Sequence, residues 1–223
     1  MLTLFLACTG PTPEPVEVIV VEPPSANPTP WPKDVQPLDA PYRSEPPPVP
    51  MQVTDSHYVH GWSDNRAVWE VRHPGMGGAS CDMWAELQVV GPEGVSDTLR
   101  FQGEQTEGSD ECSGPSPKDR IQAESPDWLA RLELEPGGRG VGGASIELTG
   151  DHHVPGEYES AAGYVLTVGD RTYERPVQEF VWSWAINEVF WSPDGTRAAA
   201  VVAGTGIGFE GQYVRYELVV LSL

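Results

Sequence analysis

Short runs of alternating apolar and polar residues dominate the chain after its first 52 residues. The runs are rich in Val, Tyr and Trp and are separated by Gly and Pro turns, which is the pattern of half-buried β-strands. They lie at Arg66–Arg72, Met83–Val90, Ala144–Thr149, Gly163–Val168, Val177–Ala185, Arg197–Ala203 and Tyr213–Leu221. The pattern predicts a mainly β fold, a small antiparallel β domain over residues 53–223, built as a sandwich or as a partial propeller-like arrangement.

One short helix is predicted inside this domain. Ser125-Pro-Asp supplies an N-cap, a proline in the first turn and an early acidic residue, which are signals of a helix start. An apolar run then extends to Leu134, and Pro136 with two glycines ends it. Leu132 and Leu134 also alternate with polar residues, so a strand remains an alternative for the second half of this segment.

Residues 9–52 have the composition of a linker rather than of a domain. The first 50 residues hold more than half of the chain's 23 prolines. Proline removes a backbone donor and fixes φ, so helices and sheet ladders do not propagate through such a segment. It favours extended polyproline II, at about 3.1 Å per residue. We therefore expect a disordered, proline-rich tether in front of the β domain.

The charge of the chain restricts its partners. The formal net charge is −20 at pH 7, and most of it falls on the predicted domain. A phosphate backbone repels such a surface, so we expect no nucleic-acid partner. Strong net charge also keeps proteins soluble, which is the simpler explanation for it. Anionic lipid headgroups are repelled as well, so attachment to a membrane would require a lipid anchor.

Two cysteines of the predicted domain, Cys81 and Cys112, form a candidate disulfide. An even pair is typical of a domain in an oxidising compartment. A closed loop of this length would stabilise the fold by roughly 3–4 kcal/mol in the chain-entropy model. Two unpaired thiols are the alternative that the sequence leaves open.

The clearest motif is a strand, a tight turn and a second strand over residues 189–202. Pro193 presets φ for the turn, and Gly195 accepts a positive φ. The segment resembles the Trp-Ser-Pro-Asp-Gly turn of TolB-type, WD-like propeller repeats. A weaker copy lies at residues 60–71, where Asp64-Asn65 stands in place of the proline and glycine. Two copies do not make a propeller, which needs at least four blades, so we interpret them as two related hairpins of one domain.

The C-terminal motifs together resemble a family of predicted secreted bacterial proteins of unknown function. The resemblance rests on the Ser-Pro-Asp-Gly hairpin, on Gly208-Phe-Glu-Gly and on a last strand that carries Arg215-Tyr. A Gly-rich loop at residues 75–78 and an Ala-Glu strand at residues 85–86 fit it further upstream. It covers roughly residues 55–223 and implies a secreted β domain, without an assigned activity.

Residues 1–8 resemble the end of a bacterial lipoprotein signal. An apolar stretch from Leu2 to Ala7 precedes Cys8, which would be the cleavage and lipidation site. The apolar stretch is shorter than in a complete signal, and no basic residue precedes it. The resemblance implies a lipid-anchored protein of the bacterial cell envelope, in the outer membrane or facing the periplasm, and Thr9 after the cysteine favours the outer membrane. A cytosolic protein with an unmodified Cys8 is the alternative.

Two functional hypotheses follow. The first is a non-enzymatic binding or scaffolding domain that presents a surface to an envelope protein or glycan and needs no cofactor. Its candidate binding surface is Trp182 and Trp184, which as residues i and i+2 of a strand share one face. That surface requires the shared face to be exposed to solvent.

The second hypothesis is a metal-dependent hydrolase. His152 and His153 form the only cluster of histidines, and Glu157 would add a carboxylate ligand if a turn brought the three together. Adjacent residues of a strand point to opposite faces, which argues against a shared metal ion. No serine lies in a Gly-x-Ser-x-Gly elbow, so the sequence offers no catalytic residue beyond this weak candidate metal site.

Overall fold

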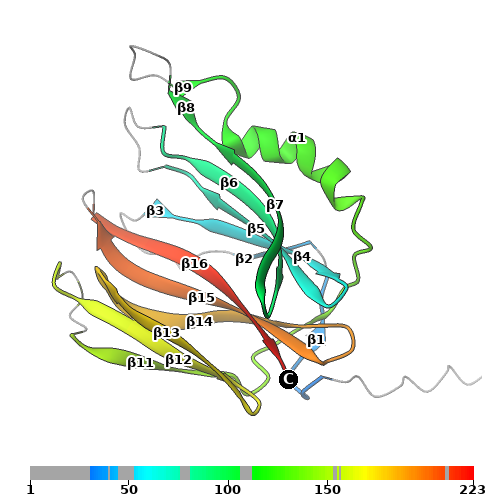
Figure 1. The fold of residues 1–223 in the computed structure, drawn as a ribbon, viewed down its shortest axis with the longest axis vertical. Helices are drawn as coiled ribbons and strands as arrows, with labels where there is room; N and C mark the ends of the chain where they lie inside the picture. The colour runs from blue at the N-terminus through cyan, green and yellow to red at the C-terminus, as the bar shows by residue number, and fades with distance from the viewer. Residues whose placement is uncertain are drawn as a thin grey trace, which may run out of the picture.

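The computed structural model describes residues 31–39, 41–44, 53–75, 81–105, 112–152, 155, 157–208 and 211–223. Within them the chain forms three stacked β-sheets and one helix, α1 (Pro117–Leu129). Figure 1 shows the order of the layers: α1, a sheet beneath it, a central sheet, and a third sheet on the far side. The fold is thus mainly antiparallel β with one helix, as the sequence predicts, and of the two predicted arrangements it is the layered sandwich.

The central sheet has six strands. They are, in spatial order, β1 (Gln36–Pro37), β10 (Gly138–Arg139), β14 (Val181–Trp191), β15 (Arg197–Gly208), β16 (Gly211–Ser222) and β3 (Val53–Thr54). All neighbours are antiparallel except β16 and β3. Both faces of this sheet are covered, so β15 carries a continuous apolar run at residues 198–203 instead of an alternating pattern.

The other two sheets cover the faces of the central sheet. The helix-side sheet consists of β2 (Tyr42–Ser44), β4 (Ser56–Ser63), β5 (Arg66–His73), β6 (Trp84–Gly91) and β7 (Gly94–Gln102). The outer sheet consists of β11 (Ser145–His152), β12 (Ala161–Val168) and β13 (Arg171–Glu179). A short ribbon of β8 (Glu104–Gln105) and β9 (Cys112–Ser113) leads into α1.

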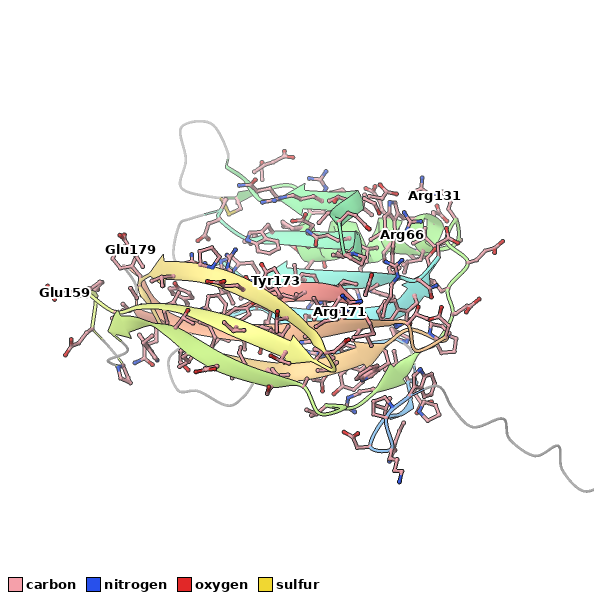
Figure 2. All side chains as sticks on the ribbon, turned by 60° about the horizontal axis from the view of Figure 1, so that its bottom comes forward. Arg66, Arg131, Glu159, Arg171, Tyr173 and Glu179 are labelled. Atoms are coloured by element: carbon pink, nitrogen blue, oxygen red, sulfur yellow. A yellow bond between two sulfur atoms is a disulfide. The ribbon has the colours of Figure 1, made fainter. Side chains whose placement is uncertain are left out.

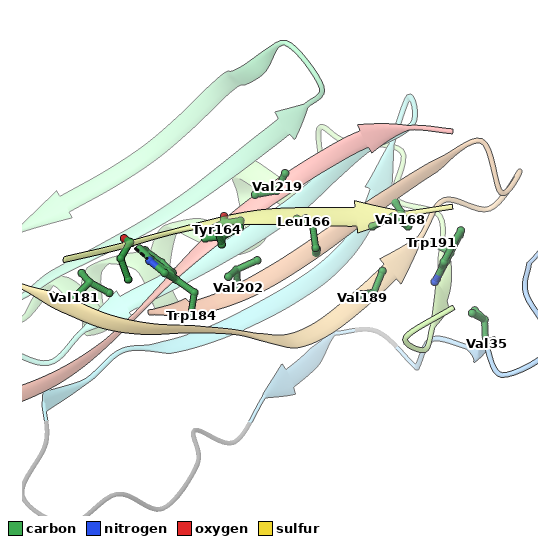
Figure 3. Packing of buried hydrophobic residues seen from close by; sticks show 13 residues of the cluster. Val35, Tyr164, Leu166, Val168, Val181, Trp184, Val189, Trp191, Val202 and Val219 are labelled. Carbon is green, nitrogen blue, oxygen red and sulfur yellow. Dashed lines mark hydrogen bonds between the residues drawn. The ribbon is translucent and has the colours of Figure 1, made fainter. Parts of the chain in front are cut away.

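Each interface between layers has its own hydrophobic core. Between the outer and central sheets, Tyr164 and Leu166 of β12 face Trp184 and Val202 (Figure 3). A Cβ on Gly204 would lie 2.5 Å from the Trp184 ring, so this glycine of β15 makes room for that indole. The three cores together explain why the alternating runs of the sequence form strands.

The second and third cores lie on the two faces of the helix-side sheet. Between this sheet and the central sheet, the buried members include Val59, Trp62, Trp69, Phe190 and Val201. The opposite face packs against α1 through Val68, Leu87, Phe101, Ile121 and Trp128. Because β5 is covered on both faces, its side chains divide between two different environments, one toward the central sheet and one toward the helix.

The predicted strands are confirmed in position, with one exception. Val177–Ala185 is not one strand, because Phe180 adopts a positive φ of 65° and separates β13 from β14. The structure also contains strands that the predicted runs do not cover, among them β7, most of β13 and the first half of β4. β7 does not show the alternation of apolar and polar residues, because most of its side chains are exposed and polar.

The helix lies earlier in the chain than the sequence predicts. Ser116 is its N-cap, and the Ser116 hydroxyl accepts the backbone N–H of Asp119 at 3.2 Å, with Pro117 in the first turn. The predicted start at Ser125 is therefore wrong, and Pro126 lies inside the last turn instead. A proline this close to the end of the helix removes only one hydrogen bond, so the helix continues to Leu129.

The domain also begins earlier than predicted. Residues 31–44, assigned to the linker, contribute β1 and β2, and Val35 and Leu38 are buried in the cores. The Trp31 indole donates to the carbonyl of Ser192 at 2.7 Å. Pro37 is tolerated because β1 is an edge strand. The remaining residues of the predicted linker, 9–30, 40 and 45–52, lie outside the described residues.

The disulfide between Cys81 and Cys112 is confirmed, with a Cα–Cα distance of 5.6 Å. It links the residues before β6 to β9 and so fixes the start of α1 next to the helix-side sheet. Its position matters for the site described below, because the first turn of α1 forms one wall of it.

The two related hairpin turns meet in space. Asp64 and Asn65 both adopt positive φ, which gives the two-residue turn between β4 and β5. The Asn65 amide donates to Asp194 at 3.0 Å, in the turn between β14 and β15. Glu135 pairs with Trp62, and β10 pairs with β14, so the segment after the helix joins the two hairpins.

Candidate binding groove

A groove of about 360 Å³ opens at one end of the helix-side sheet, beside the start of α1. Its characteristic residues are cationic or aromatic: Arg43, Tyr58, Arg72, His73, Trp84 and Lys118. They come from β2, β4, β5, β6 and the first turn of α1. No acidic side chain belongs to its lining within the described residues. In a chain of net charge −20, this local excess of positive charge identifies the groove as the strongest candidate site.

The floor of the groove is held by a buried ion pair. Glu70 of β5 is 1% exposed, and its carboxylate accepts from Arg72 Nε and lies 2.9 Å from His60 Nε2. Burial alone would raise the pKa of Glu70, but the hydrogen bonds from His60 and Arg72 outweigh it and lower that pKa. A charged Glu70 therefore fixes the guanidinium of Arg72 at the groove.

Two guanidinium groups lie against the same tyrosine ring. The Cζ of Arg72 is 4.5 Å from the centre of the Tyr58 ring, and that of Arg43 is 5.6 Å from it. Such cation–π contacts hold long side chains in place without neutralising their charge. Arg43 is exposed and forms no ion pair with any described residue, so its charge remains available at the rim.

His73 supplies a third, partly buried cationic group. Its Nδ1 lies 2.7 Å from Asp55 Oδ1, and its ring is stacked on Trp84 with centroids 5.8 Å apart. The hydrogen bond to Asp55 is the main cause that raises the pKa of His73, against a smaller opposing effect of burial, and Asp82 adds to the rise. His73 is therefore protonated over a wider pH range than a free histidine.

The start of α1 closes the groove on the helix side. Ser116 and Lys118 line it, and Lys118 is exposed with no ion pair to any described residue. The N-terminus of a helix carries a partial positive charge. The positive end of α1 thus points to the same side as the arginines, and the arrangement is suited to hold an anionic group.

A second groove of about 430 Å³ lies on the opposite side of β2, where Tyr42, Arg139 and Glu188 meet. The Tyr42 hydroxyl donates to Glu188 Oε1 at 2.6 Å, and Arg139 donates to the same oxygen at 2.8 Å. The Arg139 guanidinium also lies 4.1 Å from the centre of the Tyr42 ring. The cation of this groove, Arg139, is therefore paired within the protein, which makes the groove a weaker candidate than the cationic groove.

Several buried polar groups lie between the central and helix-side sheets. His57 is 1% exposed and packs against Tyr216, with ring centroids 4.6 Å apart. His57 Nδ1, Trp69 Nε1 and the Tyr216 hydroxyl have no hydrogen-bond partner among the described residues. Burial lowers the pKa of His57 to about 4 and raises that of Tyr216 to about 12, so both are neutral at pH 7.

The predicted aromatic surface is wrong. Trp182 and Trp184 are 7% and 3% exposed, so neither indole presents a face to solvent. Trp184 belongs to the core against the outer sheet, and its indole donates to the carbonyl of Ala162 at 3.0 Å. A register shift between Val181 and Ser183 interrupts the alternation of β14, so spacing alone does not place the two indoles on one face.

The predicted metal ligands are not brought together by any described contact. His152 ends β11, His153 lies outside the described residues, and Glu157 is exposed in the loop that follows. Figure 2 shows Glu159 of the same loop pointing outward at the end of the outer sheet, near Glu179. Among the described residues no group of three His, Cys, Asp or Glu could hold a metal ion. Cys8, the predicted lipidation site, is also outside the described residues.

Sequence reasoning missed the cationic groove, although part of the signal was present. Ser116-Pro-Lys-Asp119 is a helix start with a cap and a first-turn proline, and recognising it would have placed Lys118 at a helix N-terminus. Arg72 ends a predicted strand, and His73 follows it directly. No pattern in the sequence indicates that Arg43 joins them, because β2 pairs with β4 from within the predicted linker.

Comparison of the chain with family models, curated proteins and solved structures finds no match. In the described residues, no helix is both long enough and apolar enough to cross a membrane. The geometry of the groove is therefore the main basis for a functional assignment.

Proposed function

We propose that the protein is a non-enzymatic binding domain of the bacterial cell envelope, anchored by a lipid on Cys8. In this proposal the segment between Cys8 and Trp31 is a tether, and the cationic groove binds an anionic component of the envelope, most simply a glycan that carries acidic groups. The observation that carries the proposal is the convergence of Arg43, Arg72 and Lys118 on one groove of a strongly acidic protein.

The architecture supports a binding role for the groove. Its floor is fixed by the Glu70–Arg72 ion pair, and one wall is fixed by the Cys81–Cys112 disulfide through the start of α1. A preformed site loses little conformational entropy when a ligand binds. The disulfide also agrees with an oxidising compartment such as the envelope. No contact among the described residues favours the alternative of a metal-dependent hydrolase at His152.

Fractionation of the native cells tests the anchor. We expect the full chain in the membrane fraction, with an intact mass that corresponds to cleavage before Cys8 plus acyl chains. Cys8→Ser is expected to leave the protein out of the membrane fraction, whereas Thr9→Ser, a matched change of the neighbouring residue, is expected to leave it there. An unmodified chain in the soluble fraction, with no effect of Cys8→Ser, would contradict the proposal.

A further inference from the structure

We propose that the cationic groove is a phosphate-binding site, which recognises a phosphate ester carried by a sugar or another small polar group. The inference rests on the proposed function only for the biological source of the ligand. The binding site itself depends on the groove and can be tested on the purified protein.

The positive charge of the groove favours a dianionic ligand over a ligand with a single carboxylate. Arg43, Arg72 and Lys118 converge from three different elements, and only Arg72 has an acidic partner, Glu70 beneath the floor. Like charges brought together in this way repel each other unless an anion lies between them. A phosphomonoester carries about −1.5 to −2 charges and three strong acceptor oxygens, so one group can satisfy all three side chains.

The side chains of the groove offer the kinds of donor that a phosphate group binds. Arg72 uses Nε for Glu70, and its two Nη groups donate to no described residue. The Arg43 guanidinium reaches the same Tyr58 ring, so both guanidinium groups lie beside one tyrosine of the groove lining. Guanidinium forks bind phosphate oxygens in pairs, and lysine adds a point charge. A carboxylate has only two coplanar oxygens and would leave part of this set unused.

The first turn of α1 adds backbone donors to the side chains. Ser116 caps the N–H of Asp119, and its carbonyl accepts the N–H of Arg120, but the N–H of Lys118 donates to no described residue. The helix has 13 residues, long enough for a full dipole at its N-terminus. Phosphate groups bind at such helix starts because free N–H groups and the dipole act together.

The size of the groove accommodates more than the phosphate. Its volume of about 360 Å³ lies in the range of small-ligand pockets. Tyr58, Met83 and Trp84 form the less polar part of the lining and can contact the ring of a sugar. A flat anionic bilayer is the less favourable source of phosphate, because the net charge of −20 repels it.

Calorimetric titration of the full chain, at neutral pH in low-salt buffer without phosphate, tests the inference. The titrants are glucose 1-phosphate, glucuronate and inorganic phosphate. Glucose 1-phosphate is expected to bind at least about tenfold more tightly than glucuronate, which offers one carboxylate on a similar ring. Equal affinity for the two sugars would overturn the assignment to phosphate.

Matched variants locate the site. Arg43→Gln and Lys118→Gln are each expected to weaken the binding of glucose 1-phosphate about tenfold. Lys33→Gln removes the same charge from an exposed position that lines neither groove, and it is expected to change the affinity less than about twofold. Both groove side chains are exposed, so all three variants should unfold at the same midpoint. An equal loss in Lys33→Gln would show non-specific attraction and overturn the proposed site.

Vesicles distinguish the source of the phosphate. The full chain with Cys8→Ser is mixed with vesicles of phosphatidylcholine and phosphatidic acid. We expect no binding to them together with binding of glucose 1-phosphate. Binding to the vesicles alone would overturn the inference in favour of a lipid headgroup. A failure to bind any phosphate would overturn it too, yet the membrane anchor would still be judged separately by the fractionation of Cys8→Ser.

Discussion

Buried ionisable side chains are charged at the floor of the cationic groove but neutral in the polar interior between the two larger sheets. In the groove, Glu70 is buried and charged because Arg72 and His60 bind it. In the interior, His57 is buried and neutral because it has no acidic partner, and burial lowers its pKa to about 4. The same degree of burial thus stabilises a charge in one place and removes it in the other, according to the neighbours alone.

This difference suggests different roles for the two regions. Charges that are paired at the floor of an open groove remain available to orient other charges toward a ligand. Neutral aromatic and imidazole groups between two sheets add packing, although several of their polar atoms lack partners. Two changes test this difference: neutralising Glu70 in the groove, and protonating His57 in the interior by lowering the pH.

The largest effect is expected from the floor of the groove. Glu70→Gln leaves the Arg72 guanidinium without its buried partner, and we expect the free energy of unfolding to fall by about 3 kcal/mol. Denaturant titration measures it. The matched control is Glu86→Gln, whose partner Arg100 is half exposed, with an expected loss below about 1 kcal/mol. Equal losses in both variants would show that burial of the Glu70 pair has no special weight.

The next effect concerns acid sensitivity. The pKa of His57 is lowered from 6.5 to about 4 in the folded protein, so between these values the unfolded chain binds the proton more readily. Stability is therefore complete above pH 6.5 and falls on acidification, by about 3 kcal/mol once pH 4 is reached. Urea titrations of the protein and of His57→Gln across this range measure it.

We expect the variant to be less stable at pH 7 but to depend less on pH. The test requires the difference between pH 7 and pH 4, because other groups titrate in both proteins and cancel in the comparison. If the protein and His57→Gln lose the same stability on acidification, the neutral buried histidine has been assigned wrongly.

The smallest effect has the opposite sign and lies at the groove. Asp55 raises the pKa of His73, so this pair contributes stability below pH 6.5 and loses it as the pH rises through the folded pKa. Asp55→Asn is expected to lower the pKa of His73, which proton NMR of the imidazole measures directly. Asp82→Asn, which removes a weaker influence, is expected to shift it less. A larger shift in Asp82→Asn would reverse the assignment of the partner.

The strands and the disulfide could be predicted because their signals are local. Alternation identifies β5, β6 and β12, and Ser192-Pro-Asp-Gly195 identifies a turn whose aspartate accepts from Ser192 and Thr196. These bonds outweigh the effect of burial and lower the pKa of Asp194 to about 2. An even pair of cysteines in the predicted domain makes the disulfide a candidate, and the structure joins Cys81 and Cys112.

The site could not be predicted because its residues meet only in the folded chain. Arg43 lies on an edge strand within a proline-rich segment that has the composition of a linker. Lys118 lies in the first turn of a helix, but the Ser125-Pro126 pair predicts the start of that helix later in the chain. The tryptophans show the converse: Trp182 and Trp184 have the spacing of two residues on one strand face, yet both are buried, and Trp184 packs in the core between the outer and central sheets. Layering is a property of the whole fold, and no short pattern encodes it.

The N-terminal segment that packs along the domain also sets the order in which a mechanical load would detach it. Tension applied ahead of residue 31 first meets the Trp31 indole, which is bound to the carbonyl of Ser192, and then the pairing of β1 with β10. Only after both have yielded does it reach β2 and Arg43. Arg43 is therefore the last part of this segment to be detached, and a stretched molecule keeps its groove intact until both the Trp31 bond and the pairing of β1 with β10 are lost.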